Sequence, residues 1–139
     1  MAGTVNVDIV SPDGKVFRGE VARIRAPGVQ GSFEVLHNHA PMIAAFGIGS
    51  IVLTTSSGER IAFATSGGFL EVVDNHVSIL AETAEPGSAI DVERARESEA
   101  RAVEALKSGG VDRTEAELAL QKARNRLRIA MGGVGADHK

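Results

Sequence analysis

The chain has 139 residues, 43% of them hydrophobic, which suits one domain, or a small domain with an appendage, that buries a core. Only 4% of the residues are aromatic and the formal net charge is −3, which disfavours a stacking platform for single-stranded nucleic acid and a surface that tracks phosphates. The absence of cysteine excludes disulfides, a thiolate nucleophile and cysteine-bound zinc. No stretch approaches the roughly 18 apolar residues that span a bilayer, and the N-terminus lacks a signal-peptide pattern. We therefore expect a soluble, cytoplasmic protein that reaches membranes only through partners.

Residues 3–86 show the pattern of short antiparallel strands. Val5, Val7 and Ile9 alternate with polar residues, which places one apolar face on a core and one polar face outside. A Pro-Asp-Gly turn follows at residues 12–14. Turns about every ten residues separate further apolar, β-branched runs, which predict strands at 21–24, 50–55, 59–65, 69–73 and 76–80. This spacing is typical of a β-sandwich or a small barrel.

A glycine-punctuated stretch, residues 28–47, connects two of these strands. Its glycines permit backbone angles that other residues resist, and Pro41 holds Ala40 out of the α region. Five of its apolar side chains are too hydrophobic for a solvated linker and are expected to pack on the core: Phe33, Val35, Met42, Ile43 and Phe46. We therefore expect a folded crossover between strands.

From residue 90 the composition shifts to alanine, glutamate and arginine, and predicts two helices that are broken near residues 108–110. Asp91 is placed to cap the first helix, and Asp112, with Glu115 three residues later, to cap the second. Glu97 and Arg101 have the spacing of an exposed i,i+4 ion pair.

The second helix carries an apolar stripe that needs a partner helix: Ala116, Leu120, Ala123, Leu127 and Ala130. The first helix offers mostly small side chains to this stripe, so little apolar area is buried between the two helices. We therefore expect a two-helix domain over residues 90–131 that is marginally stable and able to open. Residues 132–139 have no periodicity and are expected to form a disordered tail.

Six segments resemble, in order, the epsilon subunit of F-type ATP synthases. The most recognisable one runs from Gly31 to Pro41 and has the pattern G-x-F-x-V-L-x-N-H-A-P. The others are residues 7–17, 65–72, 77–82, 90–95 and 116–127. The resemblance implies an α+β fold, with an N-terminal antiparallel β-sandwich over residues 3–86 followed by a C-terminal α-helical hairpin.

The resemblance also implies a function, that of a non-catalytic rotor subunit of a bacterial, proton-translocating ATP synthase that requires no cofactor. In this family the β-sandwich binds the gamma subunit and the c-subunit ring at the cytoplasmic face of the plasma membrane. It helps couple proton flow to ATP synthesis. The helices either fold down on the sandwich or extend along gamma into the alpha/beta catalytic head, where they inhibit ATP hydrolysis.

Four cations of the second helix lie in one stretch without an acid: Lys122, Arg124, Arg126 and Arg128. One interpretation is that cations near a helix C-terminus stabilise it by opposing its dipole. The resemblance implies a second one, in which these cations dock onto an acidic loop of the beta subunits. The two interpretations are compatible.

In some bacterial members of the family, an I-D-x-x-R-A segment and basic residues of the last helix bind ATP as a regulatory ligand. The matching residues here are Ile90, Asp91, Arg94, Ala95, Lys122 and Arg126. Lys122 stands where such binders carry arginine, and a lysine lacks the planar fork that grips phosphate oxygens, so we expect weaker binding. The alternative is that Asp91 is only a helix cap, followed by an exposed Arg94.

The gamma and c-ring interface is expected among residues of the 28–47 stretch, although burial in the core is the alternative for the apolar ones: Phe33, Leu36, His39, Met42 and Ile43. His37 and His39 are spaced like two ligands on a strand, but a third ligand is not evident, so no metal site is predicted.

Two other classes of protein remain as alternatives. A free-standing β-domain adaptor could dimerise through its helical pair, and sedimentation as a monomer at all concentrations would disfavour it. A small β-barrel metalloenzyme of the cupin type would be excluded by metal analysis that finds none.

Overall fold

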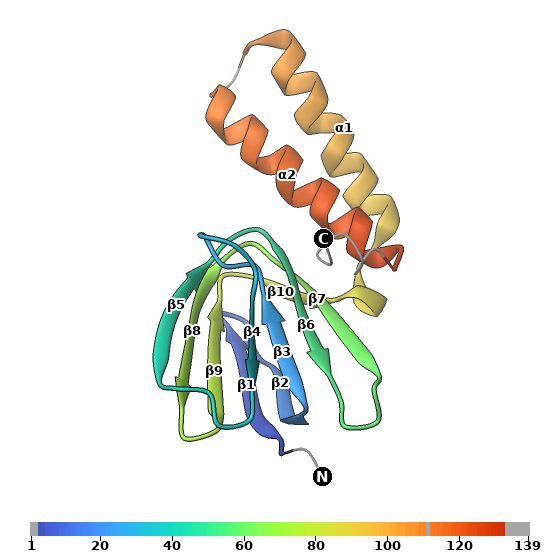
Figure 1. Cartoon of the computed structure of the whole chain (residues 1–139). Helices are drawn as coiled ribbons and strands as arrows, with labels where there is room; N and C mark the ends of the chain where they lie inside the picture. Colours follow the sequence, from blue (N-terminus) through green and yellow to red (C-terminus); the bar gives the residue numbers. More distant parts are fainter. Residues whose placement is uncertain (1–2, 111, 133–139) are drawn as a thin grey trace.

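The computed structural model describes residues 3–110 and 112–132 and shows a β-sandwich with a helical hairpin standing on one end of it (Figure 1). The strands are β1 (Val5–Ser11), β2 (Gly14–Val21), β3 (Arg23–Ala26), β4 (Phe33–Leu36), β5 (Met42–Phe46), β6 (Gly49–Thr54), β7 (Arg60–Thr65), β8 (Gly68–Val73), β9 (His76–Ala81) and β10 (Ala84–Pro86). A 3₁₀ turn, η1 (Gly87–Ala89), leads to α1 (Val92–Ser108) and α2 (Arg113–Ala130). The α+β fold class expected from the sequence is confirmed.

The sandwich consists of two five-stranded sheets. Sheet 1 has the strand order β2-β1-β9-β8-β5, and sheet 2 has the order β10-β7-β6-β3-β4. Neighbouring strands are antiparallel except for β1 and β9, which pair in parallel. That one parallel pair arises because β1 and β9 lie side by side at the centre of sheet 1 while the intervening chain builds the rest of the sandwich.

The core lies between the sheets and follows the period-2 pattern of the sequence. Val5, Val7 and Ile9 of β1 point inward as expected, and Phe17 packs edge-on against Phe63 with ring centroids 6.0 Å apart. Further fully buried side chains come from the central strands of both sheets: Ile24, Ile51, Leu53, Leu70, Val72, Val77 and Ile79. The sandwich therefore has its own core, independent of the helices.

The structure differs from the predicted strands in three places. The strand expected at residues 21–24 is interrupted at Ala22, where β2 ends and β3 begins in the other sheet. The sequence also missed most of β2, because this edge strand is half exposed and Gly19 breaks its alternation. The 28–47 stretch is a folded crossover, as expected, but it contains two strands, β4 in sheet 2 and β5 in sheet 1.

Both predicted helix caps are confirmed. An Asp91 carboxylate oxygen accepts a hydrogen bond from Arg94 N at 3.1 Å, and Asp112 accepts from the backbone of the two residues Thr114 and Glu115. The predicted Glu97–Arg101 pair is wrong, because the Arg101 guanidinium donates to Ser98 Oγ at 3.2 Å instead. No described helix is long and apolar enough to cross a membrane.

The two helices pack through alanines. The buried apolar residues of α1 are Ala95 and Ala102, and Ala116 and Ala123 face them from α2. Small side chains allow a close approach of the helix axes but bury little apolar area. Most of the tail expected at 132–139 lies outside the described residues.

Candidate functional site

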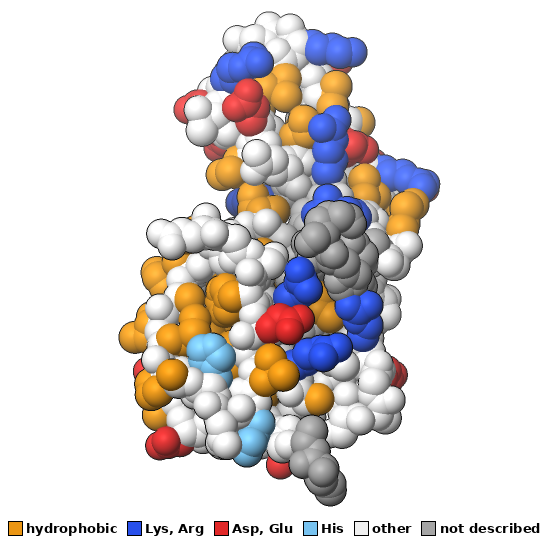
Figure 2. Space-filling view, viewed as in Figure 1, with side chains coloured by type: hydrophobic (Ala, Val, Ile, Leu, Met, Phe, Trp, Pro, Cys, Tyr) orange, Lys and Arg blue, Asp and Glu red, His pale blue; other side chains and the backbone are white. Residues whose placement is uncertain are grey.

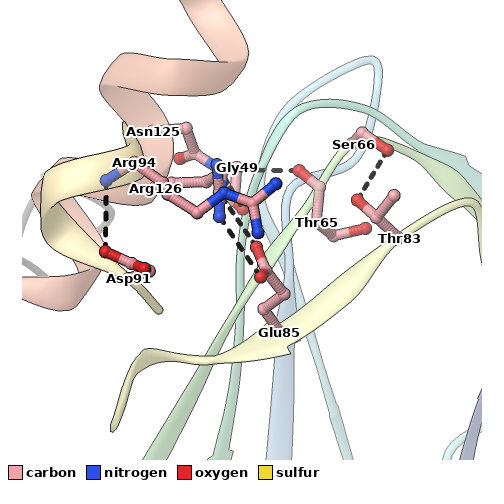
Figure 3. Close-up of polar contacts among 9 residues, drawn as sticks. All are labelled: Gly49, Thr65, Ser66, Thr83, Glu85, Asp91, Arg94, Asn125 and Arg126. Carbon is pink, nitrogen blue, oxygen red and sulfur yellow. Dashed lines mark hydrogen bonds and ion pairs between the residues drawn. The ribbon is translucent and has the colours of Figure 1, made fainter. Parts of the chain in front are cut away.

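The hairpin is anchored to the sandwich by a buried amide near the end of α2. Asn125 is only 3% exposed, and its Nδ2 donates to Gly49 O at 2.8 Å and to Thr65 O at 3.5 Å. Gly49 and Thr65 face each other across β6 and β7, so the amide sits at the last pair of that ladder (Figure 3). Asn125 Oδ1 accepts from Arg128 Nη2 at 2.7 Å, so both ends of the amide have partners.

An ion pair lies next to this anchor. Arg126 binds the Glu85 carboxylate with two hydrogen bonds, Nε to Oε1 at 2.7 Å and Nη2 to Oε2 at 3.3 Å (Figure 3). This fork geometry is the strong form of an arginine–carboxylate contact. Both side chains are partly exposed, so screening by water limits the contribution of the pair to about 1 kcal/mol.

A small apolar cluster completes the contact. Ile129 of α2 packs with Ile90 and Ala64, beside η1. Gly87 in η1 lies so close that an added Cβ would be 3.1 Å from Ile129 O. With so few apolar residues, the hairpin is held largely by polar contacts, which water can replace.

A cleft of about 480 Å³ separates α2 from the end of the sandwich. Two cations, Lys122 and Arg126, and two acids, Asp13 and Glu85, line it. Hydroxyl-bearing residues of β7 and the following segments also line it: Thr65, Ser66 and Thr83. Such a lining can hold an anionic group at the cations only where the acids do not compete for them.

The structure brings two of the six residues of the ATP prediction into this cleft, Lys122 and Arg126. The other four lie outside its lining. Ile90 is buried against Ile129, and Ala95 is buried between the helices. Asp91 caps α1, and Arg94 is an exposed residue of its first turn (Figure 3).

Three of the four cations expected to dock onto a partner are engaged within the chain. Arg124 Nε donates to Glu99 Oε2 of α1 at 3.0 Å, Arg126 binds Glu85, and Arg128 binds Asn125. Lys122 makes no ion pair with any described residue. Glu85 and Asn125 were not singled out from the sequence, because both act through partners that are distant in the chain.

The five predicted interface residues are spread over different surfaces. Phe33 and Met42 pack against the core, and Leu36 lies on the outer face of β4 in sheet 2. The His39 ring donates from Nδ1 to Ala40 O at 2.8 Å. Ile43 lies on the outer face of β5 in sheet 1 and is 73% exposed.

Sheet 1 presents an apolar patch on its outer face. Only one of its residues, Ile43, was among the interface residues predicted from the sequence. Phe69 of β8 stands directly between Ala45 of β5 and Leu80 of β9, and Ile43 lies one row away. Phe69 and Leu80 are 60% and 61% exposed. Hydrophobic side chains gather along the side of the sandwich where β5 and β8 lie (Figure 2). We call Ile43, Phe69 and Leu80 the sheet 1 patch.

The histidines raised as metal ligands bind the backbone. His37 donates from Nδ1 to Thr4 O at 3.0 Å, and His39 donates to Ala40 O. The described residues contain no group of three or more side chains that could hold a metal ion.

Comparisons with known proteins agree with this architecture. A family model described as the beta-sandwich domain of the ATP synthase delta/epsilon chain matches residues 4–87. The model of the long alpha-helix domain of the same chain matches residues 88–131. A chain in the structure of the Euglena gracilis mitochondrial ATP synthase, OSCP/F1/c-ring, superposes with a TM-score of 0.77 at 25% identity, covering 92% of this chain and 81% of that one.

Two bacterial relatives extend over nearly the whole chain. The ATP synthase epsilon chain of Salinibacter ruber is 54% identical, and the alignment covers 97% of each chain. The ATP synthase epsilon chain of Desulfitobacterium hafniense is 44% identical over 94% of this chain and 98% of its own length. Both domain models match in order, and these relatives match along almost their entire length, so the chain belongs to the family of ATP synthase epsilon chains.

Proposed function

We propose that the chain works in the central stalk of a bacterial ATP synthase, where its hairpin restrains ATP hydrolysis and its sandwich binds the gamma subunit and the c ring. In this role it catalyses nothing itself. It is a peripheral component at the cytoplasmic face of the plasma membrane, held there by its partners. Membership in the epsilon family and the likeness to a chain of an F1/c-ring assembly support the proposal.

The observation that supports the inhibitory role is that the α2 cations bind groups of the same chain in the docked hairpin, although the same cations are proposed to bind the catalytic head. In the docked hairpin Arg124, Arg126 and Arg128 are each bound to a group of the same chain. If the hairpin leaves the sandwich and its helices separate, Arg126 loses Glu85 and Arg124 loses Glu99. Both guanidinium groups then become available to an acidic surface, whereas the partner of Arg128 lies on α2 itself. Docking within the chain and docking on the catalytic head therefore compete, which makes a two-state switch.

The test is ATP hydrolysis by a catalytic head depleted of epsilon, titrated with the full chain and with a chain that ends at Pro86. The shorter chain keeps all strands and the main core cluster, so it is expected to fold. Inhibition by the full chain alone is the expected result. If both chains bind and neither inhibits, the helices have no inhibitory role; if neither binds, the stalk assignment fails.

The sandwich is proposed to meet gamma through the sheet 1 patch. Three large apolar side chains exposed on one sheet face are unusual on a free surface and typical of a protein–protein contact. Of the residues expected from the sequence, Ile43 belongs to this patch. Leu36 and His39 reach the surface and stay candidates for the c-ring contact, whereas Phe33 and Met42 pack against the core.

We also propose that ATP is a regulatory ligand of the cleft between α2 and the sandwich. Lys122 and Arg126 supply two cations for phosphate oxygens, and hydroxyls of the cleft can hydrogen-bond a ribose. Because Glu85 holds the Arg126 fork, ATP has to displace this carboxylate, which weakens binding. Calorimetry tests this directly, and the absence of heat at millimolar ATP would exclude the nucleotide role.

A further inference from the structure

A buried asparagine is an unusual way to hold a helix on a sheet. Burying an amide is costly unless its donors and acceptor are all used. Asn125 meets this demand with two backbone carbonyls on one side and a guanidinium on the other. Ile129, one helical turn further along the same face, is apolar and packs on Ala64, so the fully buried polar side chain of α2 in this contact is Asn125.

The chemistry of the partners fixes the orientation of the amide. A guanidinium can only donate hydrogen bonds, so Oδ1 must face Arg128, and a backbone carbonyl can only accept, so Nδ2 must face Gly49 and Thr65. Arg128 thereby positions the amide for the strand ends. The arrangement is specific for asparagine, because an aspartate would point a carboxylate oxygen at two carbonyl oxygens.

We infer that Asn125 is the latch residue that sets the balance between the docked and the open hairpin; the inference rests on the mobile hairpin of the proposed function. When the hairpin opens, water replaces the amide at both carbonyls and hydrates the amide itself. The net free energy of such an exchange is small, so the hairpin can undock readily, while the hydrogen bonds of the amide define one docked position. A large apolar residue would hold the helix without this reversibility.

The opening can be followed in the isolated full-length chain by thiol labelling, because the sequence contains no cysteine. Ala64 is buried beneath Ile90 and Ile129, so an Ala64→Cys reporter reacts only when the hairpin leaves the sandwich. A Val7→Cys reporter in the core of β1 reacts only on global unfolding. The two reporters separate undocking from loss of the fold.

Asn125→Asp keeps the shape of the side chain and replaces the donor with an acceptor. We expect it to raise the labelling rate of the Ala64→Cys reporter about tenfold or more, with no change at the Val7→Cys reporter beyond about twofold. Asn125→Ala, which removes the amide without adding a charge, should give a smaller increase. Gln121→Glu makes the same amide-to-acid change on an exposed position of α2 and should leave both rates unchanged.

The latch would be overturned if the Ala64→Cys reporter were labelled at the same rate with and without Asn125→Asp. Equal effects of Asn125→Asp and Gln121→Glu would overturn it too, because the added charge alone would then explain the opening. The inhibitory role is decided separately, by ATP hydrolysis of the depleted head. If Asn125→Asp opens the hairpin and hydrolysis does not respond, the latch stands and the proposed function fails.

Discussion

Gly68, the first residue of β8, shows how a single residue sets the position of the sheet 1 patch. Its φ is +155°, and an added Cβ would overlap Leu80 O and lie 2.9 Å from Ala81 Cα. The missing side chain lets β8 and β9 come together where Phe69 and Leu80 pair on the outer face.

Gly68→Ala is therefore expected to destabilise the sandwich by about 3 kcal/mol, because both the backbone angle and the contact with β9 are strained. Urea denaturation measures the change. Gly110→Ala is the matched control, since its Cβ would meet only Ser108 Oγ at 3.8 Å, and it should stay within about 0.5 kcal/mol. A Gly68→Ala chain as stable as the control would show that β8 can move away from β9.

Lys122 is the cation of the proposed ATP site that has no ion-pair partner among the described residues. It lines the cleft but presents a single ammonium group to phosphate oxygens, whereas arginine presents a fork. Lys122→Arg should tighten ATP binding about five- to tenfold in calorimetry. Lys107→Arg, in the last turn of α1 and outside the cleft, is the control. An unchanged affinity would mean that the phosphates do not reach this position.

At the scale of elements, the hairpin and the sandwich differ in how they are held together. The sandwich buries large branched side chains between two sheets, whereas the helices meet through alanines. The helices therefore depend on local features such as their caps more than the strands do. Local opening of the helices is expected at a lower free energy than global unfolding.

Removal of the α2 cap tests this dependence. Asp112 accepts hydrogen bonds from the backbone N–H groups of Thr114 and Glu115, at 2.9 and 3.4 Å. Asp112→Ala should weaken α2 by about 1 kcal/mol, which is about a fivefold faster amide exchange in that helix, while β-strand amides stay unchanged. Glu104→Ala, an exposed position of α1, is the control. Faster exchange throughout the chain would show instead that the helices and the sandwich unfold together.

Features formed by residues that are close in the sequence could be predicted from it. Contacts between residues that are distant in the sequence could not. The helix caps were found because donor and acceptor lie within three residues of each other. The Asn125 anchor was missed because its acceptor, Gly49, is 76 positions away, and only the folded sandwich brings the two together. Glu85 is likewise 41 positions from Arg126. For the same reason the register that pairs Phe69 with Leu80 could not be deduced from either strand alone.

At the scale of the whole molecule, the two proposed roles use separate surfaces. The hairpin stands on one end of the sandwich, while the sheet 1 patch lies on the outer face of β5, β8 and β9 (Figure 1). Substitutions in the patch should therefore leave the latch and the α2 cations undisturbed. This separation allows assembly and inhibition to be tested one at a time.

Phe69→Glu is expected to reduce binding to the isolated gamma subunit by about tenfold or more, because the charge would have to be desolvated at the centre of the patch. The side chain is 60% exposed, so the urea midpoint of the isolated chain should stay within error. Leu36→Glu makes a similar change on the opposite sheet, at a side chain that is 46% exposed, and Leu118→Glu does so on α2. Affinity measured by surface plasmon resonance for the three variants then locates the contact. If only Phe69→Glu loses affinity for gamma, the gamma contact is assigned to sheet 1. If only Leu36→Glu loses affinity, the contact lies on sheet 2 and the sheet 1 patch has no assigned partner.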